Sequence, residues 1–92
     1  MKSLENKTAL VTGAGSGIGR AIAILYASAG ARIVVSDINE KGGEETVSQI
    51  KASGYDAIFV KADTSKPDDS KALVDAAVKA FGGLHIAVNN AG

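Results

Sequence analysis

The sequence contains no cysteine and no tryptophan, and it has only one proline and one methionine. Without cysteine, a disulfide scaffold and a zinc site built on thiolates are both excluded. The composition is compatible with a reducing cytoplasm, where we expect the protein to reside. An excess of charge of either sign is also missing, because ten basic residues balance ten acidic ones. We therefore expect neither a nucleic acid nor an acidic membrane surface as a partner.

Long apolar runs are absent as well. None reaches the ~20 residues of a membrane-spanning helix, and the first residues do not form the apolar core of a signal peptide. The chain does have a hydrophobic fraction of 46% and 11 glycines in 92 residues. This combination is typical of one small globular α/β domain.

Short apolar runs alternate along the chain with segments in which apolar residues recur at helical spacing. The runs predict strands at residues 8–11, 33–35, 57–60 and 84–88, and the helical spacing predicts helices at 18–29, 39–53 and 67–81. The expected core faces are Ile18, Ile22, Leu25 and Ala29 in the first helix, and Leu73, Val74, Ala77, Val78 and Phe81 in the third. Strands that alternate with helices of this length indicate a parallel sheet with right-handed crossovers.

The order β-α-β-α-β-α-β predicts the fold class, an α/β Rossmann-like doubly wound parallel sheet of which this chain forms a part. The expected strand order is 3-2-1-4, with the first and fourth strands flanking the topological switch point. Ligands bind such sheets outside the carboxyl ends of the strands. Every candidate motif in the sequence follows one of those ends.

A glycine-rich loop, TGAGSGIG at residues 12–19, joins the first expected strand to the first expected helix. Glycine lets the backbone turn tightly and lets a pyrophosphate approach the N–H groups of a helix start. The spacing differs from G-x-G-x-x-G, and glycines also cluster in ordinary turns, but the position between strand and helix favours phosphate binding. No Lys-Ser or Lys-Thr pair follows, which disfavours a nucleoside-triphosphate P-loop. The candidate cofactor-binding residues are Gly13, Gly15, Ser16, Gly17, Ile18 and Gly19.

Asp37 follows the second strand, close to the spacing expected of an acid that holds an adenosine ribose. A carboxylate at this position accepts hydrogen bonds from ribose hydroxyls and repels a 2′-phosphate. Neither Ser16 nor Ile38 supplies a basic side chain that would neutralise such a phosphate. The sequence therefore favours NAD over NADP. The alternative is a solvated aspartate at a strand end.

Polar residues also follow the third and fourth strands. Asp63, ahead of Thr64, is placed to accept a hydrogen bond from an adenine amino group, or it forms a turn before the third helix. The stretch NNAG at residues 89–92 has amides that can bridge strands and a small Ala-Gly pair that leaves room for a ribose. The alternative for this stretch is a plain turn.

In this order and spacing, TGAGSGIG, Asp37, Asp63-Thr64 and NNAG resemble the short-chain dehydrogenase/reductase family over the whole chain. The resemblance implies a Rossmann fold that binds a nicotinamide cofactor. It implies pyrophosphate contacts from Gly13, Ser16, Ile18 and Gly19, a loop shaped by Gly15 and Gly17, Asp37 on the ribose, Asp63 on the adenine and Asn90 along the cofactor. It also implies that Asn89 braces the sheet. We count the neighbouring residues Ile38, Thr64, Ala91 and Gly92 with this set. His85 departs from the family, which commonly has an acid there, and we expect it to be structural.

The resemblance also implies a catalytic Ser, a Tyr and a Lys four residues after the Tyr. Tyr26 is followed four residues later by Gly30, and Tyr55 by Phe59, so no Y-x-x-x-K motif is present. We therefore expect residues 1–92 to be the N-terminal, NAD-binding half of a domain whose catalytic half is absent, and the chain alone to be inactive. The complete enzyme would transfer hydride between NAD and an alcohol or carbonyl. We expect no metal site, and self-association through the open edge of the fourth strand.

Two other functions remain open. One is a fragment of an S-adenosylmethionine-dependent methyltransferase, because that fold also has a glycine loop and an acid after its second strand. The Thr-Gly start of the loop and the NNAG stretch argue against it. The other is a structural half-domain that binds no cofactor.

Overall fold

A computed structural model describes residues 3–90 of the chain, so the predicted cofactor residues Ala91 and Gly92 lie outside the described residues. The elements follow the expected order. They are β1 (Thr8–Val11), α1 (Gly17–Ser28), β2 (Arg32–Asp37), α2 (Glu40–Ala52), β3 (Ala57–Lys61), α3 (Pro67–Phe81) and β4 (Ile86–Val88). No helix in this part of the chain is long and apolar enough to cross a membrane.

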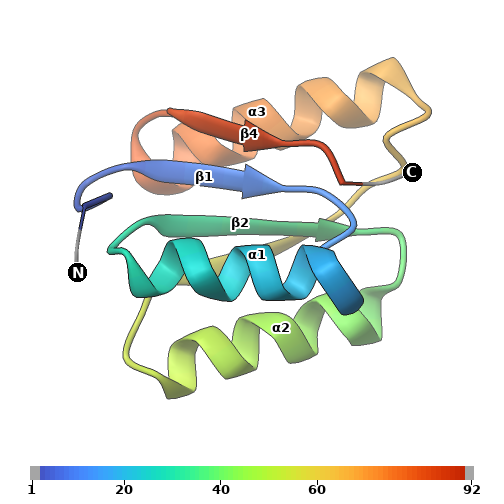
Figure 1. Cartoon of the computed structure of the whole chain (residues 1–92). Coiled ribbons are helices and arrows are strands. Elements are labelled where there is room, and N and C mark those ends of the chain that lie inside the picture. Colours follow the sequence, from blue (N-terminus) through green and yellow to red (C-terminus); the bar gives the residue numbers. More distant parts are fainter. Residues whose placement is uncertain (1–2, 91–92) are drawn as a thin grey trace.

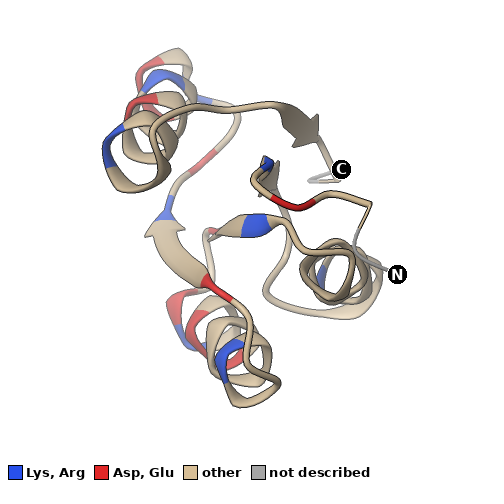
Figure 2. Cartoon of the chain, turned by 90° about the vertical axis from the view of Figure 1, so that its left-hand side faces the viewer, with Lys and Arg blue, Asp and Glu red and all other residues tan. Residues whose placement is uncertain are grey.

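The four strands form one parallel sheet in the order β3-β2-β1-β4, which confirms the predicted doubly wound fold. Helices α1 and α2 cover one face of the sheet, and α3 covers the other (Figure 1). Viewed from the end, the helices surround the sheet, and acidic and basic residues occur together on α2 and α3 rather than gathering by sign, whereas α1 carries only one charged residue, Arg20 (Figure 2). All three crossovers return the chain so that every strand ends at the same edge of the sheet.

The central strands have continuous apolar stretches, at residues 9–11 and 33–35, because helices cover both of their faces. All four residues of β1 are buried, as are the middle four of β2. Within β2, Ile33 and Val35 join the core beneath α1 and α2, whereas Val34 joins the core beneath α3. The sheet thus separates two apolar cores.

Helix α1 buries a face that matches the predicted one only in part, since Ile22 packs against the core but two of the predicted residues do not. Its buried residues are Gly19, Ala23 and Ala27, whereas Ile18 and Leu25 are 71% and 64% exposed. The small residues recur every four positions, so they form a flat stripe that lets the helix approach the sheet closely. The spacing of the larger apolar residues was therefore a poor guide to the buried face, because α1 lies so close to the sheet that small residues fill the contact.

Helices α2 and α3 also pack through a few small or branched residues. In α2, Gly43 is buried against the Phe59 ring of β3, which leaves no room there for a Cβ atom. In α3, Leu73 is buried, whereas Val74 and Val78, predicted to belong to the core face, are 43% and 51% exposed.

Strand β4 begins two residues later than predicted, at Ile86 rather than Leu84. The reason is His85, whose Nδ1 accepts a hydrogen bond from the Thr8 backbone N–H at 3.0 Å. The His85 backbone N–H in turn donates to the Thr8 carbonyl at 3.0 Å. A side chain thus takes the place of one ladder bond before the regular pairing starts, and His85 has the structural role that we expected.

Candidate functional site

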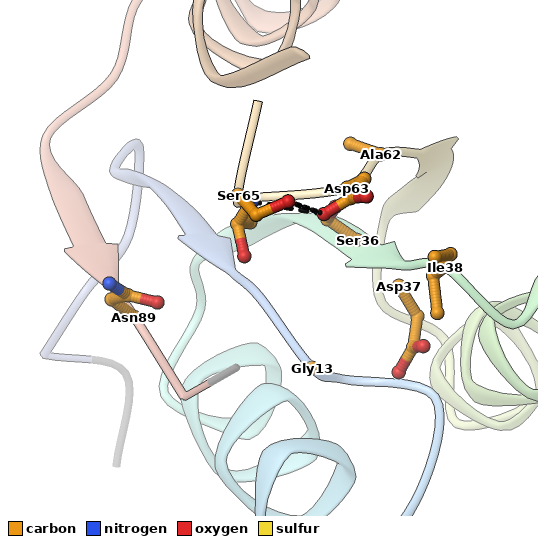
Figure 3. A pocket seen from close by; sticks show the side chains of 9 residues that line it. Gly13, Ser36, Asp37, Ile38, Ala62, Asp63, Ser65 and Asn89 are labelled. Carbon is orange, nitrogen blue, oxygen red and sulfur yellow. Dashed lines mark hydrogen bonds between the residues drawn. The ribbon is translucent and has the colours of Figure 1, made fainter. Parts of the chain in front are cut away.

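A cavity of about 440 Å³ opens at the carboxyl edge of the sheet, where the four strands end (Figure 3). This volume lies within the usual range of small-molecule sites. The lining residues come from the ends of β1 and β2, from the segment after β3, and from the segment after β4. They are Gly13, Ser36, Asp37, Ile38, Ala62, Asp63, Thr64, Ser65 and Asn89.

Five of the predicted cofactor residues line this cavity: Gly13, Asp37, Ile38, Asp63 and Thr64. The predicted residues Gly15, Ser16, Gly17, Ile18, Gly19 and Asn90 are not among those that line it, and they form or contact the glycine-rich loop beside it. The lining residues that the sequence reasoning missed are Ser36, Ala62 and Ser65, together with Asn89, which was expected only to brace the sheet. Each of the four is adjacent in the sequence to a predicted residue, and the sequence offered no other indication of them.

The backbone of the glycine-rich loop needs glycine for two separate reasons. Gly13 and Gly17 have φ angles of 63° and 56°, in the left-handed region that other residues rarely adopt. Gly15 lies against Asp37 instead, and a Cβ atom at Gly15 would be 2.7 Å from the Asp37 Oδ2 atom. The loop can therefore bring its backbone to the end of β2 only with glycine at this position.

The start of α1 has the properties of an anion site. Ser16 occupies the N-cap position with an extended backbone, but its side chain makes no capping hydrogen bond. The first turn of the helix contains no acidic residue. The first N–H groups of a helix have no intrahelical partner, and the helix dipole adds partial positive charge there. Ser16, Gly17 and Ile18 are exposed, so a phosphate can reach this end of the helix.

The Asp37 carboxylate is held at both of its oxygens. Its Oδ2 atom accepts a hydrogen bond from the Gly15 N–H at 2.8 Å, and its Oδ1 atom accepts one from the Asn39 N–H at 2.9 Å. These bonds connect the glycine-rich loop, the end of β2 and the start of α2. A half-exposed carboxylate with a fixed direction therefore faces the cavity, where it can accept further hydrogen bonds.

Asp63 is a second fixed carboxylate in the same cavity wall. Its Oδ1 atom accepts hydrogen bonds from the Ser65 hydroxyl at 2.6 Å and from the Ser65 backbone N–H at 3.0 Å, as the dashed line in Figure 3 illustrates. These two bonds, with a smaller contribution from the Lys66 charge, lower the pKa of Asp63 below its usual value of 3.8. The side chain is thus ionised at neutral pH and can only accept hydrogen bonds.

The end of β4 is tied to the glycine-rich loop through Thr12. The Thr12 hydroxyl lies 3.1 Å from the Asn89 Oδ1 atom, to which it donates, and it accepts a hydrogen bond from the Asn90 N–H at 3.0 Å. The Asn90 side-chain amide lies 3.5 Å from the Gly13 carbonyl oxygen. Asn89 therefore both braces the sheet, as predicted, and lines the cavity.

Arg20 and Thr46 also contact the loop, although no sequence pattern marked either of them. The Arg20 guanidinium donates to the Gly15 carbonyl at 2.6 Å, to the Gly42 carbonyl at 3.2 Å and to the Thr46 hydroxyl at 2.8 Å. Thr46 is buried, and its hydroxyl donates to the Ala14 carbonyl at 2.7 Å. These contacts join residues of α1 and α2 that are 26 positions apart, so only the folded chain reveals them.

The chemistry of the described site is that of binding. Tyr26 and Tyr55 pack against the core beneath α1 and α2 and do not line the cavity. Within residues 3–90 there is no group of three or more His, Cys, Asp or Glu side chains that could hold a metal ion. Two fixed carboxylates and an exposed helix start fit a ligand that combines hydroxyl or amino donors with a phosphate.

Comparison with known proteins agrees with this geometry. The sequence model of a family described as short chain dehydrogenase matches residues 7–92. Cyclohexanol dehydrogenase of Acinetobacter sp. is 53% identical over 88 residues, which cover 96% of this chain and 35% of that protein. The 7alpha-hydroxysteroid dehydrogenase of Escherichia coli is 44% identical over 89 residues, covering 97% of this chain and 35% of that protein. The chain thus spans about a third of the length of these curated relatives.

Solved structures show the same likeness in three dimensions. The crystal structure of a hydroxysteroid dehydrogenase from Escherichia coli superimposes with a TM-score of 0.94 at 44% identity, over 97% of this chain and 38% of that one. A short chain dehydrogenase from Mycobacterium avium superimposes with a TM-score of 0.93 at 37% identity.

Proposed function

Because the chain belongs to the short-chain dehydrogenase family, we propose that it is the NAD-binding portion of an oxidoreductase that interconverts an alcohol and a carbonyl compound. The observation that carries this proposal is the Asp37 carboxylate, which faces the cavity with both oxygens held by backbone N–H groups. When bound, the nicotinamide ring of the cofactor supplies the hydride acceptor or donor. The residues of this chain bind and orient the adenosine and diphosphate groups.

The residues present fit such a dinucleotide. Asp37 accepts hydrogen bonds from the hydroxyls of the adenosine ribose, and Asp63, kept ionised by Ser65, accepts one from the adenine amino group. The uncapped start of α1 holds the diphosphate through its backbone N–H groups, at Ser16 and the residues that follow it. Asn90 lies against the glycine-rich loop, on the side of the cavity nearest to β4. In this arrangement the dinucleotide crosses the carboxyl edge of the sheet.

Charge at the ribose position favours NAD over NADP. The Asp37 carboxylate lies where the 2′-phosphate of NADP would have to be placed, and like charges at short range repel. The residues that line the cavity include no lysine or arginine. Lys61 and Lys66 lie on an adjoining hollow that shares Ile38, Ala62 and Asp63 with the cavity, so positive charge is close but does not line the ribose position itself.

The catalytic Ser, Tyr and Lys of the family are proposed to lie outside these 92 residues, since no Y-x-x-x-K motif occurs in the sequence. Two relatives are named as dehydrogenases of cyclohexanol and of a 7alpha-hydroxysteroid, which supports an alcohol or carbonyl substrate for the complete protein. By itself, the chain is proposed to bind the dinucleotide without turning over a substrate.

Calorimetric titration of the chain with NAD, NADP and S-adenosylmethionine tests the proposal. We expect NAD to bind most tightly, and tighter binding of S-adenosylmethionine would establish the methyltransferase alternative instead. A folded chain that binds none of the three would be a structural half-domain.

Two glycine variants make the same test specific to the loop. Gly13→Val places a β-branched residue at a left-handed backbone position next to the cavity and should abolish NAD binding. Gly54→Val introduces the same strain at a φ of 88°, at the far end of α2. It should lower stability and leave the affinity of the folded chain for NAD unchanged. Equal loss of binding in both variants would contradict the assigned loop.

A further inference from the structure

We propose that Arg20 and Thr46 form a positioning device that sets the direction of the N–H groups in the glycine-rich loop. Arg20 aims the Ser16 N–H toward the diphosphate, and Thr46 aims the Gly15 N–H at Asp37. This inference rests on the proposed function, because it assigns these two residues to the binding of a dinucleotide.

The two residues meet between α1 and α2, behind the loop. The Arg20 Nε donates to the Thr46 hydroxyl at 2.8 Å, and its Nη2 donates to the Gly15 carbonyl at 2.6 Å. The same Nη2 reaches the Gly42 carbonyl at 3.2 Å and the Glu45 carboxylate at 3.9 Å. The planar guanidinium can hold three partners in one fixed geometry, which a lysine ammonium on a flexible stem does not reproduce.

Every backbone polar group of Ala14 and Gly15 has a hydrogen-bond partner. The Ala14 N–H donates to the Ser36 carbonyl at 3.0 Å, and the Ala14 carbonyl accepts from the Thr46 hydroxyl at 2.7 Å. The Gly15 N–H donates to Asp37 at 2.8 Å, and the Gly15 carbonyl accepts from Arg20 at 2.6 Å. Two consecutive loop residues are thus fixed at all four of their polar atoms.

The geometry of the peptide bond converts this anchoring into a direction. In a planar trans peptide, the carbonyl of one residue and the N–H of the next point to opposite sides. When Arg20 holds the Gly15 carbonyl toward α2, the Ser16 N–H points away from α2. When Thr46 holds the Ala14 carbonyl, the Gly15 N–H points the other way, toward Asp37, where the 2.8 Å bond is found.

Glycine makes such a device necessary. Gly15 has to be glycine because a side chain would collide with Asp37, but glycine also lets adjacent peptide planes rotate freely. A rotated Gly15–Ser16 peptide would present its carbonyl oxygen, instead of the N–H, to the negatively charged diphosphate. The hydrogen bonds from Arg20 and Thr46 stabilise the one orientation that favours an anion.

The two residues should therefore affect different parts of the ligand, and ADP and adenosine separate them. Arg20→Lys keeps the charge but loses the planar guanidinium that binds several acceptors at once. We expect it to weaken ADP binding about tenfold, which corresponds to ~1.4 kcal/mol, with little change in adenosine binding. Arg32→Lys is the matched control, because Arg32 starts β2 at the opposite edge of the sheet and stacks over Phe81. It should leave the affinity for both compounds unchanged.

Thr46 is tested with an isosteric pair of variants. Thr46→Val removes the hydroxyl and should weaken adenosine and ADP alike by roughly fivefold to tenfold, because the Gly15 N–H that orients Asp37 is no longer held in place through the Ala14 carbonyl. In the NMR spectrum of the unliganded protein, the Gly15 amide should move upfield and exchange faster with solvent. Thr46→Ser keeps the hydroxyl and should restore both the affinity and the Gly15 amide signal.

Several results would overturn the inference. An Arg20→Lys variant that binds ADP like the wild type would show that charge alone matters, and equal losses for ADP and adenosine would show a general loss of structure. A Thr46→Val variant with an unchanged Gly15 amide would refute the role of Thr46. Failure of the wild-type chain to bind either compound would instead refute the proposed function, so the two failures are distinguishable.

Discussion

The substitution Asp37→Asn removes one charge at almost constant shape, and the structure indicates that it is not conservative. Asp37 accepts one hydrogen bond at each carboxylate oxygen, from the N–H groups of Gly15 and Asn39. An asparagine offers one acceptor oxygen and one NH2 donor. One of the two backbone N–H groups must therefore face another donor, and either the glycine-rich loop or the start of α2 loses its anchor.

The magnitude follows from the number of bonds lost. A hydrogen bond to a charged group contributes about 1.5–3 kcal/mol, and Asp37 is half-exposed, so the lower value applies. We expect Asp37→Asn to reduce the free energy of unfolding by about 1.5 kcal/mol, which for a domain of this size lowers Tm by ~6–12 °C. Asp75→Asn is the control, because it makes the same chemical change at an exposed position of α3 and should leave Tm nearly unchanged.

The same variant changes ligand preference. Loss of the carboxylate removes a ribose acceptor and the charge that repels a 2′-phosphate, and Lys61 is the register partner of Asp37 on β3. We expect the ratio of the dissociation constants of 2′,5′-ADP and ADP to fall by tenfold or more, about 1.4 kcal/mol, when measured by calorimetry at low salt. An Asp37→Asn protein with wild-type Tm and a wild-type ratio would refute both the anchoring and the ribose assignment.

Three further predictions address other parts of the fold. Gly43→Ala should destabilise the chain by ~1–3 kcal/mol in chemical denaturation, because its Cβ atom would overlap the Phe59 ring; unchanged stability would refute this tight contact. Ser65→Ala should raise the pKa of Asp63 toward 3.8 and so reduce the stability that ionised Asp63 contributes at neutral pH, which in the wild type is lost as the pH falls through the lowered pKa; carboxyl NMR titration measures this, and an unmoved pKa would contradict it. In sedimentation, the 92-residue chain should self-associate through the outer edge of β4, which pairs only with β1 among the described strands, and Ile86→Lys should reduce association; a monomer at all concentrations would exclude it.

The sequence alone was sufficient for the order of elements, the strand order and the edge of the sheet at which the candidate cavity lies. These follow from local patterns, since continuous apolar runs predict covered strands and a right-handed crossover leaves few ways to connect them. The residues at strand ends, Asp37 and Asp63 among them, were also predictable, because parallel strands all end at one edge of the sheet. A residue that directly follows a strand in the sequence is therefore expected at the edge of the sheet where the cavity lies.

Only the tertiary structure decided which residues support those positions. Periodicity assigned Ile18 and Leu25 to the core of α1, but the close approach of that helix to the sheet buries Gly19 and Ala23 and leaves these two large side chains exposed. Arg20 carries no pattern at all, since its partners are backbone carbonyls brought near by packing. Carbonyl groups are identical in every residue, so a sequence cannot say which of them a side chain will meet; that depends on how the helices pack against each other and against the sheet.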